Sequence, residues 1–552
     1  MEVIDTSTDN VNVNVNVNVN VNVNVNDNVN NNAHARTNCI GRLVLSKRNL
    51  YKVTINNKLV NARKCHILSE NFDDILIQTN KDFNTRDIYI KFNKSIQQIS
   101  QILGTVSDSE DDLNIFHHMY TKDWMSNTKY NKLWEEMRFN PTFTITNRID
   151  YLKQVITIDP KGSVDLDDGF SFSSDETNYY LDIHIADPIS YFDFSNPIMI
   201  QIFKEFINRI NTCYIPNTKG SNNAIHLLPE NIVKYISLLE TTEEIPTRRA
   251  ITFYFIINKE TNVITFKINY TTITKIINKT YEQFDLEINN PSQIEKKQQL
   301  VNLINLIITN MSVRYKPVIV DEDISHKMIE IFMILVNNYT GVYFTQNKFS
   351  NFMIVRAQDK KDLPNDLEKI PDYCLNFLNY SANYQIIKST DSSSTHYALD
   401  LINYCHTSSP MRRVIDMLNH MLLYENKLNE SNEFNVNKFI VENLDINEIN
   451  EKIRTQKKIS TAYELVKIIK INRNFRAYAL DIIRIKDIIY GLLILRAKII
   501  IDGQEIEFKK MVNVEIPKTH EYIQIHDEFD IELHYNPINY RTYKFPFYIK
   551  IL

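Results

Sequence analysis

The chain has 552 residues, of which 43% are hydrophobic and 23% charged, and it carries a formal net charge of −5 at pH 7. This length accommodates about two to four domains, and the composition is that of a globular protein. The net charge excludes a globally basic protein, although a local channel of Lys and Arg can still attract a nucleic acid.

The cysteines and the apolar runs indicate the compartment. The five cysteines are odd in number, widely spaced and never in a C-x-x-C pattern, which argues against a disulfide framework or a zinc site. No apolar run approaches the ~20 residues of a membrane span, and the N-terminus has no basic-plus-apolar signal pattern. We therefore expect a cytoplasmic monomer, of cellular or viral origin, that has no membrane partner.

The N-terminal quarter changes character twice. Residues 1–35 are dominated by a strict alternation of Asn and Val, for which we predict a disordered low-complexity tail. Residues 36–99 contain short β-rich runs such as "RLVLS" and "DIYIKF" between polar turns, which predicts a small OB-like β-barrel. Residues 100–146 are mixed and partly helical, and we expect a degenerate second barrel or a connecting region there.

The middle of the chain, residues 147–430, alternates strand patterns such as "YYLDIHIAD" with helical patterns such as "IVKYISLLE". In one predicted helix four apolar side chains recur at helical spacing and are expected in the core: Met328, Phe332, Leu335 and Val336. This pattern predicts a large domain of mixed sheets and helices.

The last part of the chain returns to strands. Residues 431–477 contain charged amphipathic helices, and residues 478–552 are rich in β patterns with a hairpin signal at 502–503. We predict a helical connector followed by a second OB-like barrel. The expected fold class is α+β, with a central domain of mixed sheets and helices flanked by small β-barrels at both ends.

The stretch "TIDPKGSVDLDDGFSF" gathers four aspartates within ten residues: Asp159, Asp165, Asp167 and Asp168. Crowded carboxylates repel one another unless a cation lies among them. An EF-hand loop that starts at Asp165 would place Gly169 one position too early, so that alternative fails. A nucleotide-binding loop is disfavoured because the chain has no G-x-G-x-x-G or P-loop motif. A solvated acidic turn stays open.

The remaining alternative is a magnesium site. Mg²⁺ prefers hard oxygen ligands and keeps several waters and substrate phosphates in its shell. The four carboxylates can surround one or two such ions if the segment bends tightly. Two ions ~3.5–4 Å apart would clamp the attacking and leaving oxygens of an in-line phosphoryl displacement.

Several segments in sequence order resemble the catalytic domain of the ribonuclease II family, the RNB domain. The aspartate segment is similar to the family's "TIDP…D-x-DDA" signature, with Gly169 in place of the usual Ala. It is followed by "LDIHIADPISYF", by "NTCYIPN" with "HLLPE", and by "IPTRRAITF", "INKTYEQF" and "MIEIFMILVN". Most specific is "THYALDLINYCHTSSPMRRVIDMLNHMLL", which is close to the family's "HYGLA…Y-x-HFTSPIRRY" element.

The resemblance implies a domain order and a metal centre. Residues 147–430 correspond to the RNB domain, residues 36–99 to a cold-shock-type barrel and residues 478–552 to an RNA-binding barrel. Asp159, Asp165 and Asp168 are implied to bind magnesium directly or through water. Asp167 is implied at a second ion, where it helps to orient the attacking water.

The resemblance also implies contacts to RNA. Arg412 corresponds to a catalytic arginine that neutralises charge on the phosphate. Tyr214 corresponds to a tyrosine that stacks near the 3′ end, with a buried core Tyr as the alternative. Glu330 corresponds to a glutamate that reaches a ribose hydroxyl, with an ordinary helix-surface Glu as the alternative. Arg413 has a weaker claim to bind RNA, and an ion pair with Asp416 is equally expected.

Four further residues in the matched segments are expected to be structural, because magnesium does not favour imidazole ligands: His184, Asp187, His406 and His420. One departure concerns "SVRYKPVIVDEDISHK", which is much shorter than the family's hairpin at this place. A second aromatic clamp cannot be assigned there.

The implied function is that of a magnesium-dependent hydrolytic exoribonuclease. Such an enzyme degrades single-stranded RNA from 3′ to 5′ and releases nucleoside 5′-monophosphates. The resemblance implies two Mg²⁺ ions as cofactors, with Mn²⁺ as the alternative. Two alternatives stay open from the residues. One is a catalytically inactive RNB-domain protein that binds RNA, and the other is a structural protein stabilised by metal.

Overall fold

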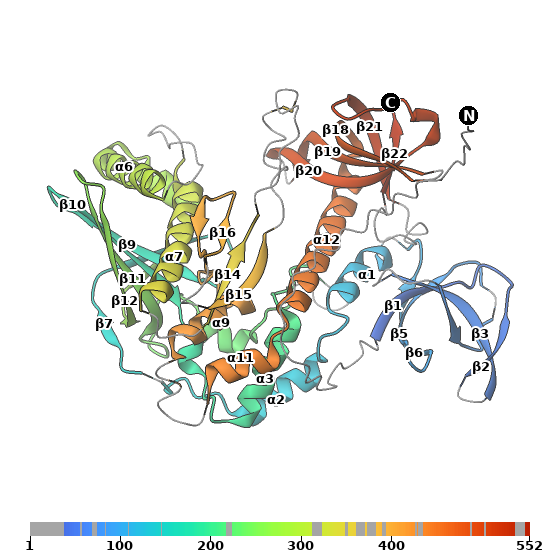
Figure 1. Cartoon of the computed structure of the whole chain (residues 1–552), viewed down its shortest axis with the longest axis horizontal. Coiled ribbons are helices and arrows are strands. Elements are labelled where there is room, and N and C mark those ends of the chain that lie inside the picture. Colours follow the sequence, from blue (N-terminus) through green and yellow to red (C-terminus); the bar gives the residue numbers. More distant parts are fainter. Residues whose placement is uncertain are drawn as a thin grey trace, which may run out of the picture.

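The computed structural model describes residues 38–552 except 56–57, 69–73, 83, 109, 145, 217–223, 312–322, 348–351, 360–369, 372–381, 389–392, 426–427, 429–433, 486–487, 502–503 and 536–546. The tail predicted for residues 1–35 and most of the short hairpin segment lie outside these residues. Figure 1 shows three parts, which are an N-terminal β-sheet, a large central body and a C-terminal barrel. No helix in the described part of the chain is long and apolar enough to cross a membrane.

The N-terminal part is a six-stranded sheet that curls on itself. Strands β1, β5, β6, β4 and β3 pair in that order, and β1 pairs again with β3. Alternating side chains fill the interior, among them Cys65, Ile90 and Phe92, which are fully buried. The strands are β1 (Asn38–Leu43), β2 (Tyr51–Ile55), β3 (Lys58–Ile67), β4 (Ile75–Gln78), β5 (Ile88–Asn93) and β6 (Gln98–Thr105).

The connection to the central body is helical. The boundary expected at residue 99 falls inside β6, and the helices α1 (Asp111–Tyr120) and α2 (Asn127–Met137) follow. Helix α2 begins after Ser126, whose side chain accepts a hydrogen bond from the amide of Lys129. Of the described residues in 100–146, only the end of β6 belongs to a barrel.

A seven-stranded sheet organises the central body, with the order β13-β8-β9-β10-β11-β12-β7. Both faces of its middle strand are covered, because Leu181 and Ile183 on one face and His184 on the other are all buried. The strands are β7 (Ile149–Tyr151), β8 (Val155–Asp159), β9 (Asp168–Ser174), β10 (Asn178–Ala186), β11 (Arg248–Asn258), β12 (Ile264–Ile273) and β13 (Ile276–Thr280).

Helices pack against this sheet and bury a single large core. Helix α7 carries the four apolar residues that its spacing predicted as core, and all four are buried. The helices of the central body are α3 (Pro197–Arg209), α4 (Glu230–Ile236), α5 (Tyr281–Ile288), α6 (Ile294–Asn310), α7 (Ser325–Asn347), α9 (Val414–Leu423) and α11 (Val436–Asn443), with 3-10 turns η1 (Pro188–Tyr191) and η2 (Pro291–Gln293).

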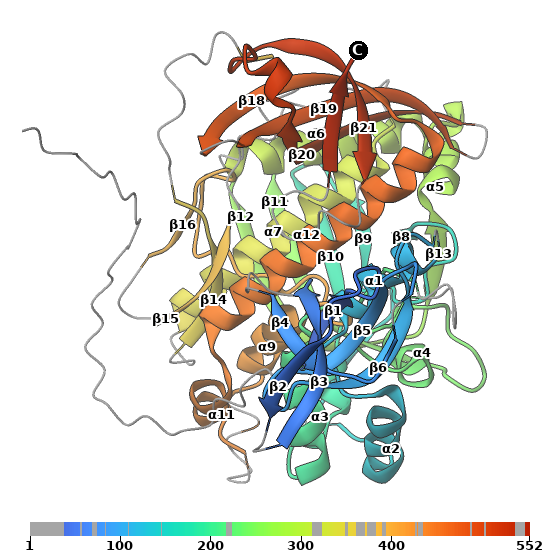
Figure 2. The ribbon, with the colours of Figure 1, turned by 90° about the vertical axis from the view of Figure 1, so that its right-hand side faces the viewer.

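Two small antiparallel pairs lie between α7 and α9 in the chain. They are β14 (Phe352–Ala357) with β15 (Asn383–Lys388), and β16 (Thr395–His396) with β17 (Leu401–Ile402). The long helix α12 (Ile446–Ile471) then runs from the central body to the C-terminal barrel, as Figures 1 and 2 both show. Asp445 caps its N-terminus, and the carboxylate accepts hydrogen bonds from the amides of Asn447 and Glu448.

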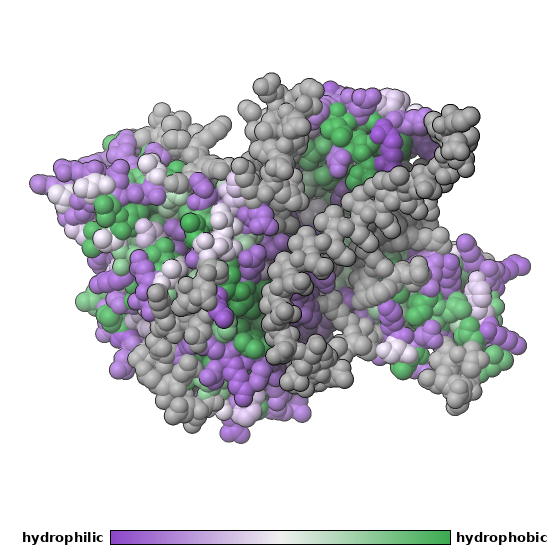
Figure 3. Space-filling view, viewed as in Figure 1, coloured by the Kyte–Doolittle hydropathy of each residue, from purple (hydrophilic) through white to green (hydrophobic). Residues whose placement is uncertain are grey.

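The C-terminal part is a closed barrel with the strand order β18-β19-β20-β22-β21. The boundary expected at residue 478 falls inside its first strand. The elements are β18 (Asn474–Ile485), β19 (Ile488–Ile501), β20 (Gln504–Ile516), η4 (Lys518–His520), β21 (Glu528–Tyr535) and β22 (Phe547–Ile551). On the face drawn in Figure 3, hydrophilic and hydrophobic residues lie side by side on both end domains. The predicted α+β class, with barrels flanking a mixed central domain, is confirmed.

Candidate metal-dependent nuclease site

The acidic segment is the connection between two neighbouring strands of the central sheet. Asp159 is the last residue of β8 and Asp168 the first residue of β9, and the strands pair at Ile156 and Phe170. The connection is anchored at Leu166, whose amide donates to Ser237 Oγ and whose carbonyl accepts the amide of Leu238. The acidic segment is therefore a short, anchored connection between two adjacent antiparallel strands.

Gly169, the departure from the family signature, has a local packing reason. A β-carbon at this position would lie 2.8 Å from Val155 Cγ1 and 3.2 Å from the carbonyl oxygen of Ile156. Both atoms belong to the paired strand β8, so glycine allows the close approach of β8 and β9. The departure leaves the neighbouring Asp168 in place at the start of its strand.

Three of the four carboxylates are destabilised as anions. Burial and the nearby Asp168 carboxylate together raise the pKa of Asp159 to about 7, against the opposing effect of Arg412. Burial also raises the pKa of Asp168 to about 6, and that of Asp167 well above its ordinary value. The positive charge that the protein itself supplies is therefore too small to balance these three buried carboxylates.

Arg412 lies beside these acids, as the resemblance implied. Its Nε is 3.2 Å from Oδ2 of Asp167, whose side chain is 2% exposed, while the arginine side chain is 48% exposed. The other oxygen of Asp167 accepts the amide of Met411 at 2.9 Å. The Asp167 carboxylate thus contacts two consecutive residues, the amide of Met411 and the side chain of Arg412.

Backbone pairing explains how Arg412 reaches a site so distant in sequence. The segment after α3 pairs antiparallel with the residues around Arg412, through a bridge between Asn211 and Arg413. The amide of Thr212 donates to the carbonyl of Arg412 at 3.1 Å, and the amide of Val414 donates to the carbonyl of Ile210 at 2.8 Å. These bonds fix the arginine loop against the central body.

Arg413 has a different environment from its neighbour. Its Nη2 is 2.7 Å from Oδ2 of Asp416, a fully buried carboxylate at the start of α9, and 3.3 Å from Ser408 Oγ. The ion pair that the sequence left as an alternative is present. A contact of Arg413 with RNA stays a prediction.

Tyr214 is exposed and lies at the acidic segment. Its side chain is 56% exposed, which rules out the alternative of a buried core tyrosine. The hydroxyl donates to Oδ2 of Asp165 at 3.3 Å. An exposed aromatic ring next to the carboxylates has the position that stacking on a terminal base requires.

His226 also contacts Asp165, and the sequence alone did not reveal it. Its Nδ1 lies 3.5 Å from the same Oδ2 atom. Burial alone would raise the pKa of Asp165, but the His226 side chain holds it below its ordinary value. In return, the Asp165 carboxylate raises the pKa of His226. The only signal in the sequence was the position of His226 directly before "LLPE".

Glu330 is exposed on helix α7, where its Oε2 is 3.1 Å from Nζ of Lys327 one turn earlier. Beside it on the same helix, His326 stacks on Tyr281 with ring centroids 3.8 Å apart and planes 4° apart. Burial, with Asp168 and Asp159, raises the pKa of Tyr281 to about 12. Glu330 thus lies on a helix whose start borders the carboxylates, and its contact with ribose stays a prediction.

The residues fit a hydrated magnesium ion rather than a preformed cage. Within the described ranges, no three His, Cys, Asp or Glu side chains are arranged as a ready-made metal site. Mg²⁺ usually takes only one or two carboxylates and completes its shell with water and phosphate. Oδ2 of Asp159 is buried and accepts no hydrogen bond in the described part of the chain. An orphaned carboxylate oxygen with a raised pKa is what a bound cation would satisfy.

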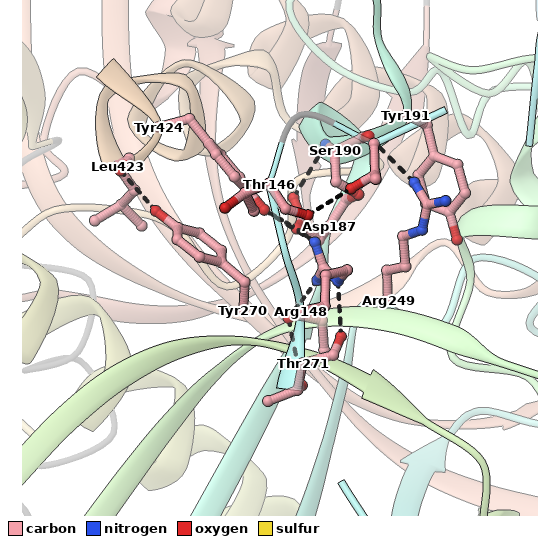
Figure 4. Close-up of polar contacts among 12 residues, drawn as sticks. Thr146, Arg148, Asp187, Ser190, Tyr191, Arg249, Tyr270, Thr271, Leu423 and Tyr424 are labelled. Atoms are coloured by element: carbon pink, nitrogen blue, oxygen red, sulfur yellow. Dashed lines mark hydrogen bonds and ion pairs between the residues drawn. The ribbon is translucent and has the colours of Figure 1, made fainter. Parts of the chain in front are cut away.

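A second cluster of buried charged side chains lies next to the strand end that contacts Asp167. Arg148 Nη1 lies 2.9 Å from Oδ2 of Asp187 and 3.1 Å from the hydroxyl of Tyr424, and Figure 4 shows the three side chains meeting. We call Arg148, Asp187 and Tyr424 the arginine cluster. Asp187 directly follows Ala186, whose amide donates to the carbonyl of Asp167 at 2.7 Å. The cluster therefore fixes the strand end on which Asp167 rests.

Comparisons with known proteins identify the family of this chain. The family profile of the RNB domain matches residues 148–429, just over half of the chain. The chain therefore belongs to the RNB-domain, or ribonuclease II, family.

Among curated relatives, Ribonuclease R of Chlamydia muridarum is 25% identical over 321 residues, which cover 49% of this chain and 45% of that protein. The mitochondrial Exoribonuclease II of Saccharomyces cerevisiae is 21% identical over 346 residues, which cover 52% of this chain and 35% of that protein. The matches thus span less than half the length of these curated relatives.

Solved structures show the same fold over almost the whole chain. Mycoplasma genitalium RNase R in complex with ribose-methylated single-stranded RNA superposes with a TM-score of 0.62 at 16% identity, covering 94% of this chain and 90% of that one. Yeast Ssd1, described as a pseudonuclease, superposes with a TM-score of 0.55 at 14% identity, covering 87% and 66%. The shared fold is therefore found in both a ribonuclease and a pseudonuclease.

Proposed function

We propose that this chain is a magnesium-dependent exoribonuclease that hydrolyses single-stranded RNA from the 3′ end and releases nucleoside 5′-monophosphates. One observation carries the proposal. Four carboxylates on one bend, three of them with raised pKa values, face a half-exposed guanidinium that is 3.2 Å from Asp167. A site with excess buried negative charge and one half-exposed arginine suits a metal ion and a phosphate together.

The residues have distinct parts in the proposed reaction. Asp159, Asp165 and Asp168 would hold Mg²⁺ directly or through water, and Asp167 would serve a second ion. Bound magnesium supplies a polarised phosphate and an activated water. Arg412 binds a non-bridging phosphate oxygen and offsets the charge that develops during displacement.

The remaining contacts position the RNA. Tyr214 stacks on a base near the 3′ end, and such stacking tolerates any sequence. Glu330 accepts a hydrogen bond from a ribose 2′-hydroxyl, which distinguishes RNA from DNA. Arg413 adds positive charge near the backbone while it holds Asp416.

The test uses 3′-labelled oligo(A) with purified protein and Mg²⁺. We expect labelled mononucleotide from the first turnovers and none in EDTA. Asp167→Asn should lower the rate by roughly 10²-fold or more, as loss of a charged active-site group does. The matched control is Asp175→Asn, which changes an exposed aspartate directly after the far end of strand β9 and should leave the rate unchanged. Mononucleotide release that persists in Asp167→Asn contradicts the proposal.

The second candidate is an RNB-domain protein that binds RNA without cleaving it, a possibility that the fold shared with a pseudonuclease keeps open. It predicts that the wild-type protein retains RNA in a gel shift and releases no mononucleotide with either Mg²⁺ or Mn²⁺. The active enzyme is favoured because the chain keeps all four aspartates and Arg412, and because Arg412 lies beside Asp167. The oligo(A) assay therefore decides between the two candidates.

A further inference from the structure

His226 and Tyr214 approach the same atom of the acidic site. The distances to Oδ2 of Asp165 are 3.5 Å from His226 Nδ1 and 3.3 Å from the Tyr214 hydroxyl. Asp165 is the only one of the four aspartates that contacts two side-chain partners in the described part of the chain. Its carboxylate is therefore held from one side.

The backbone brings these two partners to one face. Cys213 and Ile225 form an antiparallel bridge in which each amide donates to the other carbonyl at 2.9 Å. Side chains alternate along paired strands, so the residues that follow Cys213 and Ile225 point away from them. Cys213 and Ile225 pack into an apolar cluster, while Tyr214 and His226 turn toward Asp165.

The same short segment is bonded to the arginine loop. Thr212 donates its amide to the carbonyl of Arg412 at 3.1 Å, and its hydroxyl accepts the amide of Leu227 at 3.1 Å. The bridge thus ties the partners of Asp165 to the loop that carries Arg412. A displacement of this segment would therefore also displace the loop that carries Arg412.

We propose that His226 is a positioning residue for the metal centre. Tyr214 donates a hydrogen bond to Oδ2 of Asp165 and His226 Nδ1 lies 3.5 Å from the same atom, so the carboxylate is oriented with its second oxygen toward a cation. Partners of a metal-binding carboxylate that do not touch the metal commonly contribute 10–100-fold to affinity, by removing the freedom of the ligand to rotate. The inference rests on the proposed function, because it assumes that Asp165 binds metal.

The second consequence concerns coupling. Tyr214 both presents its ring for a terminal base and donates its hydroxyl to Asp165. Seating of the RNA end on the ring therefore fixes the hydroxyl, which fixes the carboxylate that holds the ion. Metal and RNA would strengthen each other's binding through this pair.

The test measures the affinity of the RNA-free protein for Mn²⁺ by electron paramagnetic resonance or calorimetry, with Mn²⁺ itself as the probe. We expect His226→Leu to weaken Mn²⁺ binding by roughly 10–100-fold. His226→Asn places an amide donor near the position of Nδ1 and should return the affinity to within about threefold of the wild type, whereas a merely structural role gives no reason for such rescue. His520→Leu changes a half-buried histidine in η4 of the C-terminal barrel; it is the matched control and should leave Mn²⁺ affinity unchanged.

The outcomes separate the inference from the proposed function. Unchanged Mn²⁺ affinity in a folded His226→Leu overturns the role of His226, even if the wild type degrades RNA. Equal loss in His226→Leu and His226→Asn, with unchanged melting temperatures, also overturns it. A wild type that binds Mn²⁺ tightly, loses affinity in His226→Leu and releases no mononucleotide refutes the proposed enzyme and supports the inference about His226.

Discussion

The central body contains two buried clusters of charged side chains, the arginine cluster and the acidic site, and they differ in how their charge is balanced. In the arginine cluster, the Arg148 guanidinium donates to Asp187, Tyr424 and the carbonyls of Thr271 and Ala250. In the acidic site, one half-exposed arginine faces four carboxylates, and an oxygen of Asp159 accepts no hydrogen bond in the described structure. The first cluster satisfies its own charge, and the second does not.

The difference indicates what each cluster is for. A buried ion pair with all its hydrogen bonds made is a structural element, because breaking it leaves a charge without a partner. A buried group of like charges costs free energy in the isolated protein and is retained where a ligand supplies the missing charge. The arginine cluster therefore holds the strand end under Asp167, whereas the acidic site has the unbalanced negative charge that the proposed metal ion would offset.

The largest effect is expected on breaking the arginine cluster. Arg148→Met leaves the buried Asp187 carboxylate without its cation and should lower the free energy of unfolding by about 3–5 kcal/mol. The measurement is urea denaturation followed by circular dichroism. The control is Arg476→Met on β18, which removes exposed ion pairs to Glu528 and Asp530 and should cost less than about 1 kcal/mol. Equal costs for both variants would mean that burial of the cluster does not matter.

The second prediction compares two adjacent arginines, of which Arg412 lies in the acidic site and Arg413 forms a buried ion pair. Arg412→Lys loses the planar fork at the phosphate and should slow mononucleotide release by roughly 10²–10³-fold while the melting temperature stays close to that of the wild type. Arg413→Lys weakens the buried pair with Asp416 and should cost about 1–2 kcal/mol of stability, with a smaller effect on the rate. If both variants changed the rate and the stability to the same extent, the two arginines would not have different roles.

These comparisons also show what the sequence could predict. The spacing of the aspartates predicted one acidic bend, and the bend connects β8 and β9 as required. Arg412 was assigned by resemblance, and the structure brings it to Asp167. The barrels followed from alternating apolar residues, but their limits did not, because the last strand of the first sheet and the first strand of the second run past the expected boundaries.

What the sequence missed depends on backbone pairing between distant segments. His226 reaches Asp165 only because Ile225 bridges Cys213, and no local pattern encodes an isolated bridge. The choice for Arg413 stayed open because an arginine three residues before an aspartate is compatible with either partner. Burial of Asp416 at the start of α9 decides that an ion pair is made.

The third prediction concerns the pH dependence of stability without metal. The pKa of Asp168 is about 6 in the folded protein against an ordinary value of 3.8, and that of Asp159 is about 7. A carboxyl group whose pKa is raised on folding contributes stability that is complete below its unfolded pKa and is lost as the pH rises through its folded pKa. The wild type in EDTA should therefore lose stability between about pH 4 and about pH 7 from these two groups.

Asp168→Asn removes one of these groups and should reduce that loss. At about pH 8 in EDTA the variant should be more stable than the wild type, by on the order of 1–3 kcal/mol, and at about pH 4 the two should be nearly equal. Buried His184, whose pKa is lowered to about 3, has the opposite pH dependence, but it is common to both proteins and cancels in the difference. Melting curves at several pH values check that the difference grows with pH, and a constant difference at all pH values would contradict the prediction.

The smallest effect is expected at the exposed edge of the acidic site. Tyr214→Leu removes the ring and should weaken binding of single-stranded oligo(A) in EDTA by about 1–2 kcal/mol, since a base that stacks on a half-exposed ring keeps part of its contact with water. Tyr214→Phe keeps the ring and loses only the hydroxyl on Asp165, so its RNA affinity in EDTA should stay within about threefold of the wild type. Fluorescence anisotropy measures both variants without turnover. Equal losses of RNA affinity in Tyr214→Leu and Tyr214→Phe would mean that the hydroxyl contributes more than stacking of the ring. Tyr214 would then act mainly through its contact with the Asp165 carboxylate.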